Sequence, residues 1–115
     1  MTDDSEDRWS RVLADVRAFV AEREWEPFHD PKNLAMAVAS EAGELLSELR
    51  WIEGPESDAH CRDPEHRQAV IDEIADVAIT LTMLADRVGV DLPEAMHAKL
   101  VKNREKYPAD EWRGR

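Results

Sequence analysis

Apolar residues recur every three or four positions over four separate stretches of this chain, and this spacing constrains the fold more than any other feature. No stretch alternates apolar and polar residues long enough to predict a β-strand. The first helical stretch is Trp9–Val20, and an Asp3-x-x-Glu6 capping box precedes it. The sequence therefore predicts an all-α protein.

Capping signals predict where the other long helices begin and end. Each begins with an aspartate followed by a proline or by a capping box, namely Asp30-Pro31, Asp63-Pro64 and Asp91-x-x-Glu94. The predicted helices run over about residues 31–52, 64–88 and 92–106, and Gly89 stands where a left-handed helix end favours glycine. Residues 54–63 and 109–115 lack a helical period, so we expect a loop and a tail that is mobile or docked on another chain.

The chain has the length of one domain, so residues 1–115 are predicted to form a single all-α domain with a core over about 5–108. Ala35-Met36-Ala37-Val38-Ala39 is apolar on more than one helical face, which a single thin layer of helices would leave exposed. We therefore expect a four-helix bundle-like subunit that assembles as a homodimer or as a homotetramer, a dimer of dimers.

Charge and cysteine content exclude several classes of partner. The net charge of -11 arises from 26 acidic and 15 basic residues and repels phosphate backbones and anionic membranes, so no nucleic acid polymer and no membrane partner is predicted. The longest apolar stretch, residues 77–85, is too short to span a bilayer, and the acidic start of the chain does not resemble a targeting segment. Cys61 is the only cysteine, so a cytoplasmic location is expected.

Two carboxylate pairs interrupt apolar stripes on adjacent predicted helices. Glu41 and Glu44 are three positions apart on one helix, and Glu73 and Asp76 repeat the spacing on the next. Glu41 follows Val38 by three positions, as Glu73 follows Val70. An ionised carboxylate that faces a core must be paired, metal-bound or neutralised. The alternative is that these are solvated acids on amphipathic helices.

Divalent cations are the simplest compensation for these charges, because few basic residues share the two stripes. Two unit charges about 4 Å apart repel by roughly 4 kcal/mol at an effective dielectric of about 20. Ligation by oxygen alone favours Mg²⁺, or Mn²⁺, in a site completed by phosphate and water. The predicted metal ligands and catalytic residues are Glu41, Glu44, Glu73 and Asp76.

Five sequence motifs follow one another along residues 28–108: Phe28-His29-x-Pro31-Lys32-Asn33-Leu34, Glu41-x-Gly43-Glu44-Leu45, Trp51, Glu73-Ile74-x-Asp76-Val77 and Lys99-x-x-x-Asn103-Arg104-x-x-Tyr107-Pro108. With these motifs the sequence resembles the MazG-like all-α nucleoside triphosphate pyrophosphohydrolases over about residues 25–108, and is most similar to their dCTP pyrophosphatase branch. It implies Mg²⁺-dependent hydrolysis of an NTP or dNTP between its α and β phosphates, giving the monophosphate and pyrophosphate. A house-cleaning role on dCTP or modified cytidine nucleotides would follow.

The resemblance also implies substrate-binding residues outside the carboxylate motifs. Lys99 and Asn103, with Lys106 on the same side of the last helix, are expected to meet phosphates, and Lys32 and Asn33 to approach the ligand at a helix start. Trp25 and Trp51 occupy positions at which relatives place aromatic residues around the base, where stacking contributes about 1 to 3 kcal/mol. For these residues, and for His29, ordinary structural or surface roles are the alternative.

Two departures from the family pattern affect mechanism and substrate. Some relatives carry an acidic general base just before the first motif glutamate, where this chain has Ser40, so a motif carboxylate or a metal-bound hydroxide remains as the base. Thr80 stands where dCTP-specific relatives carry tyrosine, so the pocket is expected to differ there. Two other functions remain open: a phosphoribosyl-ATP pyrophosphohydrolase-like enzyme, and a non-catalytic helical metal-binding interaction module.

Overall fold

The computed structural model describes residues 4–115, and side chains from residue 8 onward. The α-helices in this range are α1 (Asp4–Glu22), α2 (Pro31–Leu49), α3 (Ser57–Arg62), α4 (Pro64–Arg87), α5 (Leu92–Lys106) and α6 (Ala109–Trp112). Two 3-10 turns, η1 (Glu26–Phe28) and η2 (Gly54–Glu56), lie between them. Residues 4–115 contain no strand, so the predicted all-α class is confirmed.

The predicted helix starts are confirmed by capping hydrogen bonds. The carboxylates of Asp30, Asp63 and Asp91 accept hydrogen bonds from the backbone N–H groups of Asn33, Glu65 and Glu94, respectively. Gly89 has a φ of +73°, the left-handed conformation expected after a helix end. The Asp3-x-x-Glu6 box lies outside the residues whose side chains the structure describes.

The structure differs from the sequence prediction in two segments. Residues 54–63 are not a loop, because η2 and α3 occupy most of them, and the Ser57 hydroxyl donates to the Gly54 carbonyl at 2.7 Å. A six-residue helix is too short to reveal a period of 3.6 residues. In the tail, α6 forms a single turn, and Trp112 packs edge-to-face against Tyr107 with ring centroids 5.1 Å apart.

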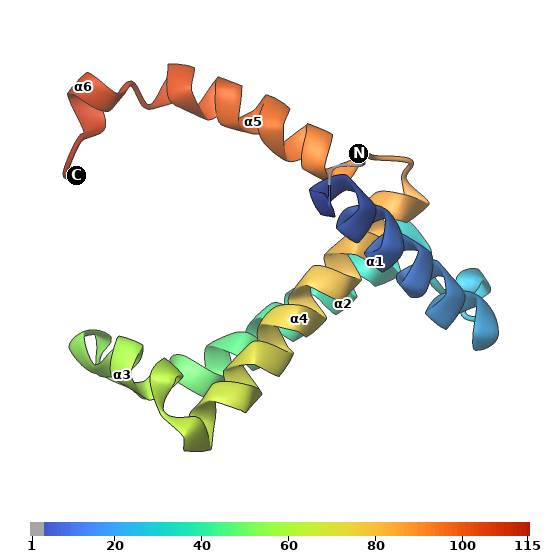
Figure 1. Cartoon of the computed structure of the whole chain (residues 1–115), viewed down its shortest axis with the longest axis horizontal. Helices are drawn as coiled ribbons and strands as arrows, with labels where there is room; N and C mark the ends of the chain where they lie inside the picture. The colour runs from blue at the N-terminus through green and yellow to red at the C-terminus, as the bar shows by residue number, and fades with distance from the viewer. Residues whose placement is uncertain (1–3) are drawn as a thin grey trace.

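The centre of the subunit is the pair formed by α2 and α4, which make the most extensive helix contact and run in opposite directions (Figure 1). The α1 helix crosses α4 near the end where α2 begins (Figure 1). The few buried apolar side chains among the described residues lie on these three helices: Val16 on α1, Leu34 on α2, and Val70 and Ala85 on α4. The core of the described subunit is therefore small.

A bidentate ion pair also ties α1 to α4. The Arg17 guanidinium on α1 donates to both carboxylate oxygens of Asp86 on α4, with the shortest contact at 2.6 Å. These hydrogen bonds lower the pKa of Asp86, because they stabilise its charged form. The pair holds α1 across α4, where side chains of both helices line a groove.

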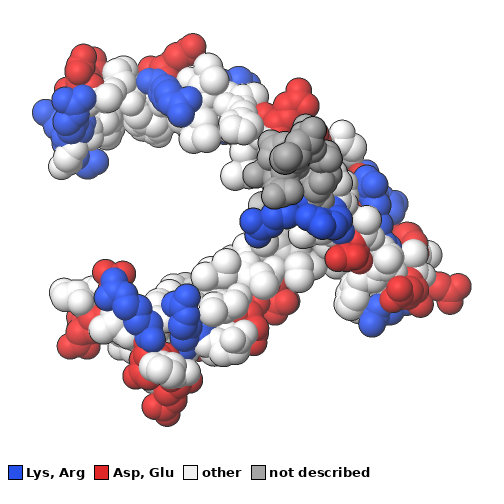
Figure 2. Space-filling model, in the orientation of Figure 1, with Lys and Arg blue, Asp and Glu red and all other residues white. Residues whose placement is uncertain are grey.

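The subunit is far more open than a compact domain. Its radius of gyration is 17.3 Å, whereas about 13 Å is expected for a compact chain of this length. The α5 helix projects away from the α2–α4 pair, and none of its residues is buried within the described chain (Figure 1). Uncharged surface runs along α5 and the α2–α4 pair on the face shown in Figure 2. None of the described helices is long and apolar enough to cross a bilayer.

Candidate active site

Three of the four predicted carboxylates converge between α2 and α4. Glu41 on α2, and Glu73 and Asp76 on α4, each offer one carboxylate oxygen, and these oxygens lie within 4.8 Å of one another. Glu73 and Asp76 share a face of α4 because they are three positions apart. Glu41 reaches them because α2 packs along α4. Such an arrangement of oxygens suits a divalent cation.

Glu73 is the most perturbed member of this carboxylate cluster. Its Oε2 atom is buried and has no hydrogen-bond partner among the described residues, although buried polar atoms are nearly always hydrogen-bonded. Burial raises the pKa of Glu73, and the neighbouring charges of Asp76, Glu41, Glu44 and Glu48 raise it further. None of the ion pairs between described residues includes any of these five acids. The cluster is therefore uncompensated.

Glu44 and Glu48 belong to the edge of this site. Both are close enough to act electrostatically on Glu73, but the three converging oxygens do not include theirs. Glu48 follows Glu41 by seven positions and Glu44 by four, so all three lie on one side of α2. Glu48 was not among the predicted site residues, although its helical spacing from Glu41 and Glu44 is the signal that identifies it.

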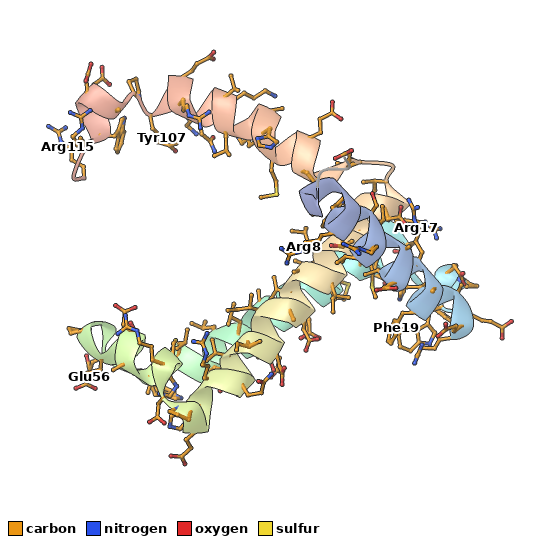
Figure 3. The ribbon with its side chains drawn as sticks, viewed as in Figure 1. Arg8, Arg17, Phe19, Glu56, Tyr107 and Arg115 are labelled. Carbon is orange, nitrogen blue, oxygen red and sulfur yellow. The ribbon has the colours of Figure 1, made fainter. Side chains whose placement is uncertain are left out.

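An apolar groove of about 440 Å³ opens beside the carboxylate cluster. Its apolar lining comes from Val12, Val16 and Phe19 on α1 and from Ile79 and Met83 on α4. Phe19, labelled in Figure 3, lies near the end of α1 that leads into η1. Pockets of roughly 300 to 1,000 Å³ with mostly apolar walls are typical of small-molecule sites.

The polar lining of the groove comes from all three helices that form the core. Glu41 and Asp76 connect the groove to the carboxylate cluster, Thr80 lies one helical turn after Asp76, and Asp15 enters from α1. The Thr80 hydroxyl lies 3.0 Å from the Asp76 carbonyl and 3.1 Å from the Val77 carbonyl, to which it donates. The groove is thus apolar along its walls and lined with oxygen atoms where it meets the carboxylates.

The residues expected to act at the start of α2 lie near the groove but do not line it. Trp25 packs edge-to-face on the groove residue Phe19, with ring centroids 5.5 Å apart, and also contacts His29. His29 lines a separate cavity of about 310 Å³. Asn33 donates its side-chain amide to the Phe28 carbonyl and to Asp30, so it holds the turn before α2. Lys32 is exposed.

The remaining expected ligand residues lie far from the carboxylates within one chain. Trp51 is 84% exposed and follows α2 about ten residues after Glu41, roughly 15 Å along a helix. Lys99 and Asn103 border a shallow hollow lined by α5 residues. Figure 3 places Tyr107, at the end of α5, far from Phe19, which lines the groove. One chain therefore does not bring these residues to the site.

A second group of metal-ligating side chains occurs at the first turn of α4. Asp63, Glu65 and His66 have ligand atoms within 4.8 Å of one another. They are close neighbours in the sequence, and an Asp63 oxygen already accepts the Glu65 backbone N–H at 3.0 Å. Their proximity follows from their neighbouring positions around the first turn of α4.

Comparison with known proteins identifies relatives of this chain. The model of the MazG-like family matches residues 37–115. The chain is 42% identical over 107 residues to dCTP pyrophosphatase 1 of Mus musculus and 43% identical over 102 residues to that of Homo sapiens, covering 90% and 85% of this chain. It spans 63% and 60% of the length of those two proteins.

A solved structure shares the fold. The crystal structure of a pyrophosphatase from Archaeoglobus fulgidus superimposes with a TM-score of 0.81 at 34% identity, covering 88% of this chain and 93% of that one. The residues matched by the family model include all four motif carboxylates and the whole of α4. The chain belongs to the MazG-like family.

Proposed function

We propose that this chain is a nucleoside triphosphate pyrophosphohydrolase that releases a nucleoside monophosphate and pyrophosphate. The observation that carries this proposal is the convergence of Glu41, Glu73 and Asp76 beside an apolar groove that Glu41 and Asp76 help to line. The carboxylates suit a metal that binds phosphates, and the groove suits a nucleoside. The names of its relatives, dCTP pyrophosphatase 1 and a pyrophosphatase, support the same reaction.

The carboxylate cluster fits Mg²⁺, with Mn²⁺ as the alternative. The donor set consists of hard oxygen atoms, and the buried, unpartnered Oε2 of Glu73 gains a partner when a cation is present. Glu41, Glu73 and Asp76 would hold the ion, and the charge of Glu44, which acts on Glu73, would add to its attraction. When bound, such an ion offsets charge on phosphate oxygens and lowers the pKa of a coordinated water.

The side chains of the groove position the nucleotide. Val12, Val16 and Phe19 offer an apolar wall to the base and sugar, and they exclude water from one side of the reacting phosphates. Ser40 is exposed and lacks a carboxylate, so it does not serve as the general base. A carboxylate of the cluster is left as the group on this chain that takes the proton from the attacking water.

Deoxycytidine triphosphate and modified cytidine triphosphates are the proposed substrates. The names of the curated relatives support this choice. Thr80 is smaller than the tyrosine expected from the dCTP-specific pattern, and it leaves more room beside Asp76. A cytosine with an added substituent would use that room.

A test of this proposal is the release of pyrophosphate from a panel of ribonucleoside and deoxyribonucleoside triphosphates with Mg²⁺. We expect pyrophosphate and the matching monophosphate, with dCTP among the best substrates. Ion-exchange chromatography distinguishes pyrophosphate from orthophosphate. Orthophosphate alone, or no product from any nucleotide, would exclude the proposed reaction.

The proposed assembly is a homodimer or homotetramer in which a second copy completes the site. Trp51, Lys99 and Asn103 match the family motifs, but within one chain they do not reach the carboxylates. Large apolar side chains on several helices are exposed in the single subunit, including Met36, Leu46, Ile74 and Met96. Contacts between copies would bury these side chains and bring the cationic α5 residues to a neighbouring site.

The mass of the particle in solution tests this assembly. We expect light scattering coupled to gel filtration to give two or four times the chain mass of 13.2 kDa. Leu46→Glu, which places a charge on exposed apolar surface, should lower the measured mass, whereas the exposed Glu53→Gln should not. A wild-type particle of 13.2 kDa at all concentrations would contradict the proposal.

A further inference from the structure

Asp15 interrupts the apolar stripe with which α1 lines the groove. Val12, Val16 and Phe19 lie on one face of α1, and Asp15 lies on that face three positions after Val12. Among the side chains of α1 that the structure describes, Asp15 is the only charged one in the groove lining. None of the ion pairs found between described residues uses its carboxylate. This carboxylate is therefore available to a ligand in the groove.

The groove offers hydrogen-bond acceptors where a base would lie. An ionised carboxylate such as that of Asp15 accepts hydrogen bonds and donates none. The Thr80 hydroxyl gives its hydrogen to its own helix, at the Asp76 or Val77 carbonyl, and turns only lone pairs toward the groove. Glu41 and Asp76 belong to the metal cluster. The polar groups of the groove that remain free to contact a base, those of Asp15 and Thr80, are therefore hydrogen-bond acceptors.

Nucleobases differ in whether they present a donor to such acceptors. Cytosine and adenine carry an exocyclic amino group, whereas uracil, thymine and hypoxanthine carry a carbonyl oxygen in the corresponding position. An amino group next to Asp15 would form a charge-assisted hydrogen bond, and a carbonyl there would place two acceptors against each other. Sites of this kind reject the analogue that cannot complete the bond.

We propose that Asp15 is a specificity-determining residue that selects nucleotides whose base carries an exocyclic amino group. The inference rests on the proposed function, because it places a nucleoside in the groove with its phosphates at the carboxylate cluster. It extends that function from cytidine nucleotides to a chemical class that includes adenine nucleotides. It also assigns the discrimination between bases to α1, a helix that carries none of the carboxylate motifs.

The test compares Asp15→Asn with wild type on two pairs of substrates. Each pair, dCTP with dUTP and dATP with dITP, has the same ring system and differs by an amino group in place of a carbonyl, together with the proton that the neighbouring ring nitrogen then carries. In wild type we expect a higher kcat/KM for the amino member of each pair. In Asp15→Asn the amino-to-carbonyl ratio should fall by about 10-fold or more, because the asparagine amide can turn its N–H₂ toward a carbonyl.

Glu22→Gln is the matched control, since it removes one acidic charge from the same helix at an exposed position that does not line the groove. It should leave both ratios unchanged. An equal loss on all four substrates in Asp15→Asn would overturn the proposal, because Asp15 would then serve the phosphates or the metal. Unchanged ratios would overturn it as well.

Failure of the proposed function gives a different result. In that case the wild-type protein releases no pyrophosphate from any nucleotide, and calorimetric affinities for the same four nucleotides with Mg²⁺ replace kcat/KM. Tighter binding of the amino member that is lost in Asp15→Asn would still support selection by Asp15. Equal affinities within each pair would overturn it.

Discussion

Replacing Glu73 with glutamine is expected to abolish pyrophosphate release while leaving the helices folded. Glu73→Gln keeps the size of the side chain but removes a negative charge from the cluster with Glu41 and Asp76. Loss of a residue that merely supports a metal ligand costs roughly 10- to 100-fold in metal affinity. Loss of a ligand should cost more, so we expect kcat/KM to fall by over about 100-fold.

Asp72→Asn is the control for this change, because Asp72 precedes Glu73 on α4, is exposed, and accepts a hydrogen bond from Gln68 rather than facing the cluster. It should retain nearly full activity. Circular dichroism of both variants should match wild type. If Glu73→Gln turned over substrate at the wild-type rate, the carboxylate cluster would not be the catalytic centre.

Metal and a triphosphate together are expected to raise the thermal midpoint strongly, and the gain should depend on pH. Ligand at about 100 times its dissociation constant stabilises the folded state by about 2.7 kcal/mol, a shift on the order of 10 °C for a chain of this size. If phosphates complete the ligand set as proposed, the shift with Mg²⁺ and a non-hydrolysable dCTP analogue together should exceed the sum of the shifts that each produces alone.

The direction in which stability changes with pH follows from the raised pKa of Glu73. The folded protein raises the pKa of Glu73 above its ordinary value of 4.5, through burial and neighbouring acids. Its contribution to stability is therefore fully present below pH 4.5 and is lost as pH rises through the raised pKa. In the metal-free protein the charged form of Glu73, which forms above this raised pKa, destabilises the fold, and a bound cation would relieve this cost.

The increase in thermal midpoint produced by Mg²⁺ should consequently be large at pH 8 and smaller toward pH 5, where protons compete with the cation for Glu73. Differential scanning fluorimetry across this pH range measures it. The Glu73→Gln variant should be more stable than wild type without metal and should gain little from Mg²⁺. A metal shift that is equal at every pH and survives in Glu73→Gln would remove Glu73 from the ligand set.

The sequence predicted the long helices because their signals are local. An aspartate that accepts a backbone N–H at the first turn identifies a helix start without reference to the rest of the molecule, as at Asp30 and Asp91. The short helices α3 and α6 contain too few residues to show a period, so they were missed. The extent of the single domain stays a prediction.

The convergence of Glu41 and Glu73 was predictable because each of these two residues interrupts an apolar stripe. Asp15 carries the same signature on α1, but the sequence does not say that α1 crosses α4 beside Glu41, so its place in the groove required the fold. The positions of Trp51 and Lys99 were not predictable for a related reason. Motif spacing does not reveal whether two residues meet within one chain or between two copies.

The exposed course of α5 has a consequence for how the chain becomes ordered. An isolated helix of about 12 to 15 residues is marginal in water, and α5 has 15 residues, none of them buried against the described chain. Its backbone protons should therefore exchange quickly with solvent at high dilution and slowly once another surface covers the helix. Helix formation in α5 and its docking on another surface would then be a single event. Deuterium uptake in this segment would report that event without an attached fluorophore.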